Sequence, residues 1–278
     1  MIIFLAAFLG ILQTFTEIFP LSSTAHHILL DMLFGFKKSY PAYDVMIDCG
    51  VLLAYFVYFS KDIASLFREA AVMVRMPFSR DPTLSMGYPY GTILGYLLAS
   101  TLITGFVRVT FEDAAGTVGH WRVALGLSWA IMGFLLLLGR RFENGSRSIY
   151  LINHQDAFLI GLAQGLAVFP GISRIGITLL VAMALGMERR EAARYSFLLA
   201  VPYTIGAILY KFRLGPRFFD SDQIALFIAF TSSAIAGILF LAMAMRMIER
   251  SKFYLAGYYC IAIGLFTIGF SLARLPLF

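Results

Sequence analysis

The sequence has few charged residues and almost no cysteine. Only 14% of its 278 residues are charged, whereas 60% are hydrophobic and the mean hydropathy is +0.81. An average soluble domain is ~45–50% apolar and ~25% charged, so a soluble enzyme of this length is excluded. Cys49 and Cys260 lie far apart and form no CxxC spacing, which excludes a disulfide-rich scaffold. The composition therefore indicates a membrane protein with several spans.

The net charge of +6 comes from Lys and Arg residues that stand singly or in pairs between apolar segments. Scattered charges of this kind are typical of the loops of membrane proteins, so we expect no nucleic-acid partner. The first apolar run has no basic region before it and leads to Glu17 and Pro20 rather than to a small-residue cleavage site. We therefore expect Met1 to belong to the mature fold.

Six apolar stretches are long enough to cross ~30 Å of hydrocarbon. These predicted spans cover residues 43–59, 88–107, 123–139, 195–210, 224–245 and 253–273. Four further apolar runs are too short to cross: residues 2–16, 18–30, 157–169 and 175–187. Pro20 separates the first two runs and Pro170 separates the other two. Each pair of runs predicts a helix–loop–helix hairpin that enters and leaves the membrane on one side.

The two predicted hairpins share a sequence pattern. Each contains Gly-x-x-Gln, Phe-Pro and Pro-x-x-Ser, starting at Gly10 in the first copy and at Gly161 in the second. Chance similarity between apolar segments is the alternative, but three predicted spans follow each copy. We therefore predict an all-α polytopic membrane protein, one membrane domain over residues 1–278 with repeats at about 1–145 and 152–278. Because three is odd, the second repeat would be inverted in the membrane relative to the first.

The loops carry unequal numbers of basic residues. One set contains thirteen: Lys61, Arg68, Arg75, Arg80, Arg140, Arg141, Arg147, Arg189, Arg190, Arg194, Arg246, Arg250 and Lys252. The opposite set contains eight: Lys37, Lys38, Arg108, Arg122, Lys211, Arg213, Arg217 and Arg274. This bias places the first set in the cytoplasm and both termini outside. Residues 61–75 alternate apolar and polar positions, which fits an amphipathic helix on the cytoplasmic interface or a solvated connector.

Glu17 and Arg174 stand at the breaks of the two hairpins. A charge within a membrane segment costs several kcal/mol and marks a functional site by default. Inverted hairpins would bring the two residues together, as a structural ion pair or as parts of a site. The surrounding hydroxyl groups belong to Ser22, Ser23, Thr24, Ser173 and Thr178. His26 follows Ser23 by one helical turn, so both can face the same site.

The breaks would also bring two helix N-termini to one point. Serines after Pro20 and Pro170 are good N-caps, and the free N–H groups of helix N-termini favour an anion. The fork of Arg174 suits two phosphate oxygens. Glu17 would repel a bare phosphate, so it indicates either a general base or a bound divalent cation. Oxygen ligands favour Mg²⁺ or Ca²⁺, and the sequence has no Cys/His cluster for zinc.

At these residues the sequence resembles a known family. Gln13-x-x-x-Glu17 and Pro20-Leu-Ser-Ser-Thr-Ala-His26 are similar to its (E/Q)xxxE and PxSSTxH segment, and Pro170-Gly-Ile-Ser-Arg-Ile-Gly-Ile-Thr178 is similar to its PGxSRxxxT motif. The family is the integral-membrane undecaprenyl-diphosphate phosphatases associated with bacitracin resistance. The resemblance implies hydrolysis of undecaprenyl diphosphate to the monophosphate, which recycles the lipid carrier for cell-wall glycans. It also implies a divalent cation and an active site that opens to the outer face of the plasma membrane.

The resemblance, taken position by position, implies roles for the residues at the breaks. Arg174 would clamp the diphosphate, and the other phosphate-binding groups would be Ser22, Thr24, Ser173 and Thr178. Glu17 would bind the cation or activate the nucleophile, and Gln13, which stands where many members have a second acid, would be a further ligand. Ser23 would be the nucleophile with His26 as base or leaving-group acid, or would orient the phosphate while water attacks.

The main alternative is a polyprenyl-phosphate transporter that moves the lipid between leaflets without hydrolysis, since inverted repeats are transporter architecture. An ion channel is disfavoured because the spans have few polar residues. His27 and His154 are interpreted as interfacial groups. Asp48 is interpreted as an interfacial or helix-end group, with a functional role open because it lies inside a predicted span. The sequence leaves the oligomeric state open, a homo-oligomer included.

Overall fold

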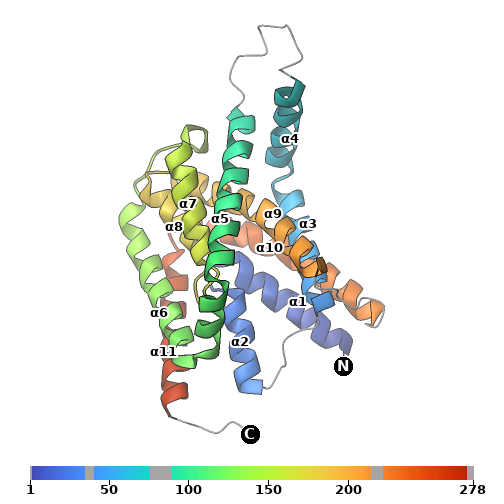
Figure 1. The fold of residues 1–278 in the computed structure, drawn as a ribbon, viewed down its shortest axis with the longest axis vertical. Coiled ribbons are helices and arrows are strands. Elements are labelled where there is room, and N and C mark those ends of the chain that lie inside the picture. The colour runs from blue at the N-terminus through green and yellow to red at the C-terminus, as the bar shows by residue number, and fades with distance from the viewer. Residues whose placement is uncertain (1, 35–40, 76–88, 214–221, 274–278) are drawn as a thin grey trace.

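The computed structural model describes residues 2–34, 41–75, 89–213 and 222–273. These residues form helices joined by short connections (Figure 1). The helices are α1 (Ile2–Ile18), α2 (Ser23–Phe34), α3 (Pro41–Tyr58), α4 (Ser60–Arg75), α5 (Pro89–His120), α6 (Arg122–Leu138), α7 (His154–Leu166), α8 (Arg174–Ala184), α9 (Arg189–Arg213), α10 (Gln223–Glu249) and α11 (Tyr254–Leu272). Two 3₁₀ turns, Gly139–Phe142 and Ile149–Leu151, follow α6. The predicted all-α class is confirmed.

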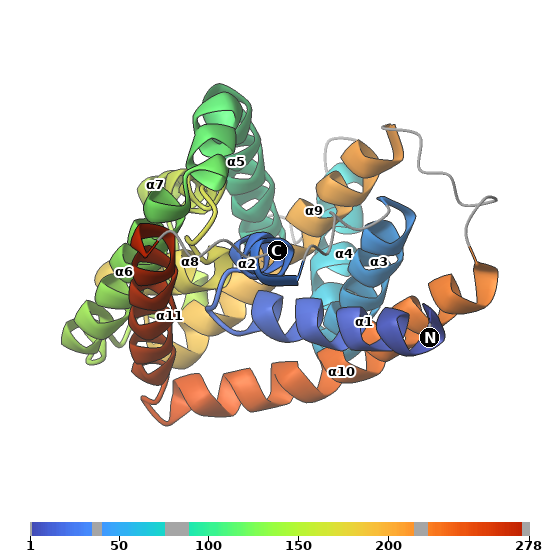
Figure 2. The ribbon, with the colours of Figure 1, turned by 90° about the horizontal axis from the view of Figure 1, so that it is seen from below.

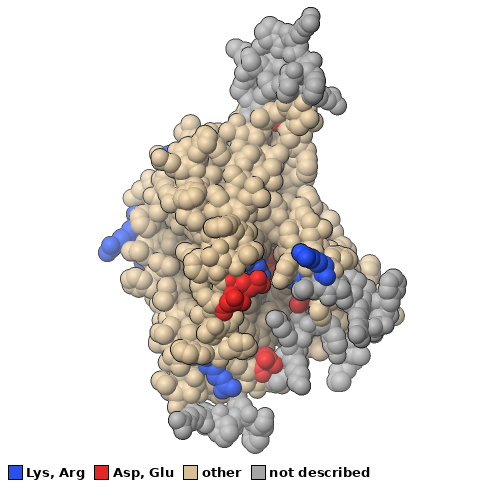
Figure 3. Space-filling model, in the orientation of Figure 1, with Lys and Arg blue, Asp and Glu red and all other residues tan. Residues whose placement is uncertain are grey.

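Six helices in the described ranges are long and apolar enough to cross a membrane: α3, α5, α6, α9, α10 and α11. They correspond to the six predicted spans, so the chain is a multi-pass membrane protein. Large apolar side chains lie exposed on them, for example Leu102 and Phe106 on α5 and Leu239 on α10. Such a surface is stable where lipid replaces water. The face drawn in Figure 3 is accordingly mostly uncharged, with a few acidic and basic side chains near its centre.

The largest departure from the predicted boundaries is in α5. The predicted span ends at residue 107, but α5 continues to His120 through exposed polar residues that include Glu112 and Asp113. Backbone hydrogen bonding carries the helix past the end of its apolar run. Arg108, which the loop count assigned to a connection, therefore lies inside a helix. Some predictions concern residues outside the described ranges. These are the loop charges Lys37, Lys38, Arg80, Arg217 and Arg274, and the placement of Met1.

Both predicted hairpins are present as short helices joined by tight loops. The first consists of α1 and α2, and the second of α7 and α8, with Pro20 and Pro170 in the loops. Helix α1 packs on α10, and α7 packs on α5 (Figures 1 and 2). Each hairpin thus packs on the middle span of the other half, α10 or α5. A two-fold relation between the halves predicts this reciprocal packing. The inverted insertion of the two halves stays a prediction.

Glycines allow α6 and α11 to pack closely along their length (Figure 2). A Cβ atom on Gly126 would lie 2.6 Å from the carbonyl oxygen of Gly264, and one on Gly133 would lie 2.6 Å from that of Gly257. These distances are below van der Waals contact, so the seam tolerates only a hydrogen at these positions. Small residues at a membrane helix interface let the backbones approach in this way.

We predict that Gly133→Ala lowers stability by about 1–3 kcal/mol, because the added methyl overpacks the α6–α11 seam. Thermal unfolding of the purified protein in detergent measures the loss. Gly105→Ala on α5 is the matched control, since a Cβ there meets nothing within 4 Å. Equal unfolding temperatures for the two variants would contradict this account of the seam.

Candidate functional site

The loops of the two hairpins lie against each other. The backbone N–H of Gly171 donates to Oγ of Ser22 at 3.1 Å, and the indole N–H of Trp129 donates to the carbonyl of Leu21 at 2.9 Å. Ser22 and Gly171 have φ values of 68° and 102°, in the left-handed region. A Cβ on Gly171 would lie 2.6 Å from Cβ of Ser128, so glycine is required there. These contacts hold the end of α1 next to the start of α8.

Glu17 and Arg174 form a buried ion pair at this junction. Glu17 lies in the last turn of α1 and Arg174 is the first residue of α8; Nη2 of Arg174 is 2.7 Å from Oε1 of Glu17. The two side chains are 7% and 17% exposed, for Glu17 and Arg174 respectively. The guanidinium of Arg174 lies 4.0 Å from the centroid of the Tyr203 ring on α9. Its Nη1 atom is buried and has no hydrogen-bond partner among the residues that the structure describes. The predicted approach of the two residues is confirmed, and Arg174 keeps an N–H group for a ligand.

Two hydroxyl groups lie within the first turns of α8. Ser173 is the N-cap of α8, and its Oγ accepts from the backbone N–H of Gly176 at 3.2 Å, which confirms the predicted cap. Thr178 is fully buried and its hydroxyl donates to the carbonyl of Arg174 at 2.9 Å. Both side chains therefore also order the helix start that carries Arg174.

The hydroxyl groups of the first hairpin are arranged differently. Ser22 contributes its Oγ to the contact with Gly171 rather than to the start of its own helix. Ser23 is the first residue of α2 and is half-buried, whereas Thr24 is exposed. Neither Ser23 nor Thr24 forms a side-chain hydrogen bond within the described part of the chain, so both hydroxyls remain available to a ligand.

His26 on α2 is fixed through both ring nitrogens. Its Nδ1 lies 2.8 Å from the carbonyl oxygen of Ser22, and its Nε2 lies 2.7 Å from the hydroxyl of Tyr259 on α11. Because a carbonyl only accepts, we assign the proton to Nδ1, and Nε2 then accepts from Tyr259. The ring stacks on Tyr259, with centroids 5.7 Å apart. His26 is one turn from Ser23 as predicted, but its nitrogens contact other groups. Tyr259 was missed because it lies 233 residues away in an aromatic-rich span.

A second buried ion pair lies near the first. Oδ2 of Asp48 on α3 is 2.5 Å from Nζ of Lys211 on α9, and Nε2 of Gln13 donates to Oδ1 of Asp48 at 3.4 Å. Asp48 is therefore buried and paired, and its interpretation as an interfacial group is wrong. Lys211 was missed because the loop count placed it outside the helices. A carboxylate within an apolar span needs a counter-ion, and that need was the available signal.

The donor set around Glu17 fits a hard divalent cation. Oε1 of Gln13 is buried and accepts no hydrogen bond from the described part of the chain. Gln13 precedes Glu17 by four residues on α1, so the two side chains are neighbours on the helix. Mg²⁺ is commonly held by one or two protein oxygens together with water and substrate phosphates. In the described ranges, no three His, Cys, Asp or Glu residues come together as a complete protein cage would require. The predicted ligands Glu17 and Gln13 therefore fit a cation that the substrate helps to bind.

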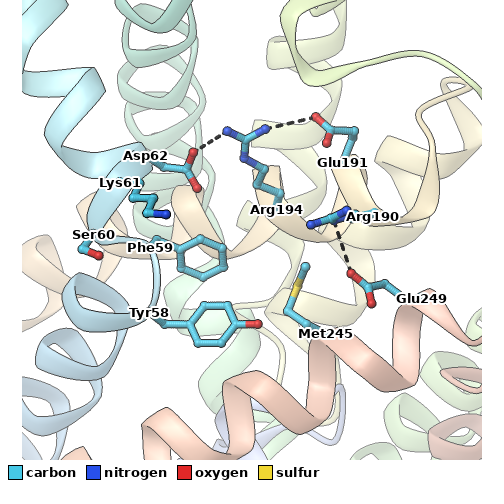
Figure 4. A pocket seen from close by; sticks show the side chains of 10 residues that line it. All are labelled: Tyr58, Phe59, Ser60, Lys61, Asp62, Arg190, Glu191, Arg194, Met245 and Glu249. Carbon is cyan, nitrogen blue, oxygen red and sulfur yellow. Dashed lines mark hydrogen bonds and ion pairs between the residues drawn. The ribbon is translucent and has the colours of Figure 1, made fainter.

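A cavity of about 510 Å³ lies elsewhere, where the end of α3 and the start of α4 meet α9 and α10 (Figure 4). Arg194 there pairs with Asp62 and Glu191, and Arg190 pairs with Glu249. Lys211, by contrast, lies near the opposite end of α9, and Asp48 lies near the middle of α3. Both arginines have carboxylate partners: the Arg194–Asp62 pair joins α9 to α4, and the Arg190–Glu249 pair joins α9 to α10. We therefore interpret this network as a structural contact between helices rather than as the reactive site.

The fold and the site define a class of polytopic membrane protein. In this class two broken hairpins meet, and a buried acid–arginine pair forms a polar site between their loops. The family described as bacitracin resistance protein BacA matches residues 6–266, and the chain belongs to this family. The resemblance in the two motifs is thereby confirmed.

Curated relatives match over nearly their whole length. The undecaprenyl-diphosphatase of Geobacter sulfurreducens is 36% identical over 273 residues, which cover 97% of this chain and 98% of the relative. That of Geotalea daltonii is 34% identical over 272 residues, covering 96% and 98%. That of Methanosphaera stadtmanae is 31% identical over 273 residues, covering 95% and 96%.

We predict that Lys211→Met destabilises the protein by about 3–5 kcal/mol, because it leaves the buried carboxylate of Asp48 without its counter-ion. The double variant Asp48→Asn, Lys211→Met should recover much of that loss. Unfolding in detergent measures both, with Arg213→Met, an exposed cation two residues further along α9, as the control. If the single and double variants lose equal stability, the two side chains are not coupled.

Proposed function

We propose that the protein hydrolyses undecaprenyl diphosphate to undecaprenyl phosphate and phosphate, and so recycles the lipid carrier of cell-wall glycans. Its relatives are named for this activity over nearly the whole chain, which favours hydrolysis over transport without hydrolysis. The observation that carries the proposal is the Glu17–Arg174 pair, whose arginine retains a buried N–H group without a partner in the described ranges. A site that only paired two charges would leave no such group unsatisfied.

The diphosphate binds at the start of α8. The Nη1 group of Arg174 donates to a phosphate oxygen, and backbone N–H groups at the helix N-terminus add further donors. Ser173 adds its hydroxyl hydrogen, which the helix cap does not use, whereas the buried hydroxyl of Thr178 already donates to the carbonyl of Arg174 and orders the helix start. The polyprenyl chain then extends along the apolar outer surface of the spans. In this pose the bridging oxygen between the two phosphorus atoms lies next to the carboxylate of Glu17.

Hydrolysis breaks the bond from the outer phosphorus to the bridging oxygen, and the lipid monophosphate leaves. In the covalent route, Ser23 Oγ attacks the outer phosphorus, its proton passes to a nearby base, and the lipid monophosphate leaves a phosphoserine. Water then attacks the phosphorus of the phosphoserine, which releases phosphate and returns a proton to Ser23 Oγ. In the direct route, water attacks and Ser23 orients the phosphate. His26, held by Ser22 at Nδ1 and by Tyr259 at Nε2, acts as base when Nε2 exchanges the Tyr259 hydroxyl for the attacking group, and then returns that proton to the leaving oxygen as acid.

A divalent cation, Mg²⁺ or Ca²⁺, would be held by Glu17 and Gln13. When bound it would neutralise phosphate charge as a Lewis acid. We place the protein in the plasma membrane with the site open to the outer face, in keeping with the excess of basic residues in the opposite loops.

The first test is phosphate release from farnesyl and undecaprenyl diphosphate by purified protein in detergent, with Mg²⁺, with Ca²⁺ and with a chelator. We expect release that needs a divalent ion. Arg174→Ala should reduce kcat/KM by at least about 100-fold, since it removes a charged donor from a buried phosphate. Arg122→Gln, at an exposed position, should keep full activity. An Arg174→Ala variant that keeps most of its activity, or no release with any cation, refutes the proposal.

A separate prediction concerns the nucleophile. In the covalent route, Ser23→Ala should lower kcat by about 10³-fold or more, because the attacking oxygen is removed. Ser22→Ala is the matched comparison, since its hydroxyl binds the opposite loop and its loss should lower the unfolding temperature. Turnover by Ser23→Ala within a few-fold of the parent assigns the attack to water and removes Ser23 as nucleophile.

A further inference from the structure

Arg108 lies in the second half of α5, just after the apolar run of that helix. It lies twelve residues before the end of α5 at His120, about 18 Å along the helix axis. Its neighbours Phe106 and Val109 are about three-quarters exposed on an apolar surface. No ion pair of Arg108 occurs within the described ranges, and Glu112, one turn further on, is exposed and unpaired with it. A partly buried arginine without an acidic partner among the described residues can bind an anionic ligand.

One tyrosine connects Arg108 to the reactive site. Nη1 of Arg108 donates to the hydroxyl of Tyr203 at 2.8 Å, and the guanidinium of Arg174 lies over the ring of the same tyrosine at 4.0 Å. Tyr203 therefore holds two guanidinium groups, one at its hydroxyl and one over its face. The other N–H groups of Arg108 have no partner in the described part of the chain, and its side chain is only partly buried.

Among the charged residues described around the site, Arg108 is a positive charge that no acidic residue neutralises. Glu17 neutralises Arg174, and Asp48 neutralises Lys211. Among the described residues that contact these pairs or Tyr203, Arg108 is the cation without an acidic partner. A lipid monophosphate carries less charge than a diphosphate, so a second guanidinium discriminates between the substrate and the lipid product.

We propose that Arg108 binds the diphosphate directly beside Arg174 and sets the preference for a diphosphate over a monophosphate. The inference rests on the proposed function, because it assigns Arg108 to the same substrate. Arg108 is then a specificity-determining residue, with Tyr203 positioning both arginines. Its remaining N–H groups donate to the phosphate that Arg174 does not fully neutralise.

Binding of two probes to the purified protein in detergent tests the proposal. The probes are farnesyl methylene-bisphosphonate, which is not hydrolysed, and farnesyl monophosphate, both titrated by calorimetry. We expect Arg108→Gln to weaken the bisphosphonate about tenfold or more and the monophosphate less than about threefold, as loss of one charged hydrogen bond implies. Arg108→Lys should keep the preference in part, and Arg122→Gln should keep both affinities.

A purely structural role of Arg108 makes a different prediction. If Arg108 only fixes Tyr203, then Arg108→Gln and Tyr203→Phe, which removes the hydroxyl and keeps the ring under Arg174, each weaken the bisphosphonate and the monophosphate by the same factor. That result overturns the proposal, as does an unchanged preference in Arg108→Gln. Should Arg108→Gln unfold in detergent, the comparison of Arg108→Lys with Tyr203→Phe decides in the same way.

The outcome separates from that of the proposed function. Wild-type protein that binds the bisphosphonate through Arg108 but releases no phosphate from farnesyl diphosphate refutes hydrolysis and leaves the binding role intact. Wild-type protein that releases phosphate, while Arg108→Gln keeps its preference and its KM, refutes the role of Arg108 alone.

Discussion

The structure depends on the cost of placing charge in an apolar environment. A carboxylate or guanidinium in the membrane is stable only beside an opposite charge or a hydrogen-bonding partner. Glu17 and Arg174, which are 157 residues apart in the chain, form an ion pair between the two hairpins. Asp48 and Lys211 form another between α3 and α9. These two pairs connect both halves of the chain, so the same contacts that neutralise the charges also join the halves around the site.

The fold was largely predictable because membrane thickness fixes the length of a span. Six long apolar runs and four short ones gave the spans and the hairpins, and the prolines marked the loops. The boundary of α5 was not predictable from hydropathy, because its helix continues beyond the apolar run to His120. That error placed Arg108 in a loop. Hydropathy measures where lipid contact ends, whereas backbone hydrogen bonding determines where a helix ends.

The centre of the site was predictable and its surroundings were not. Glu17 and Arg174 stood at breaks in apolar segments, and the similarity of the two hairpins indicated that they meet. Tyr259, Tyr203 and Lys211 come from distant helices and have no motif around them, so only the packing of α9 and α11 shows that they reach the site. The similarity of the two hairpins also predicted the same role for their serines, which the structure does not show. Ser173 caps its own helix, whereas Ser22 binds the opposite loop.

The exchange of partners between the halves has a consequence for biosynthesis. Helix α1 is made first, yet the helix on which it packs, α10, begins at Gln223. During translation the carboxylate of Glu17 has no ion-pair partner until Arg174 has been synthesised. Helix α1 lacks its main packing partner until α10 follows, after more than three-quarters of the 278 residues. Neither half can bury its hairpin alone, so the nascent chain must keep its first hairpin loosely held, at the interface or in the insertion machinery, until the last spans arrive.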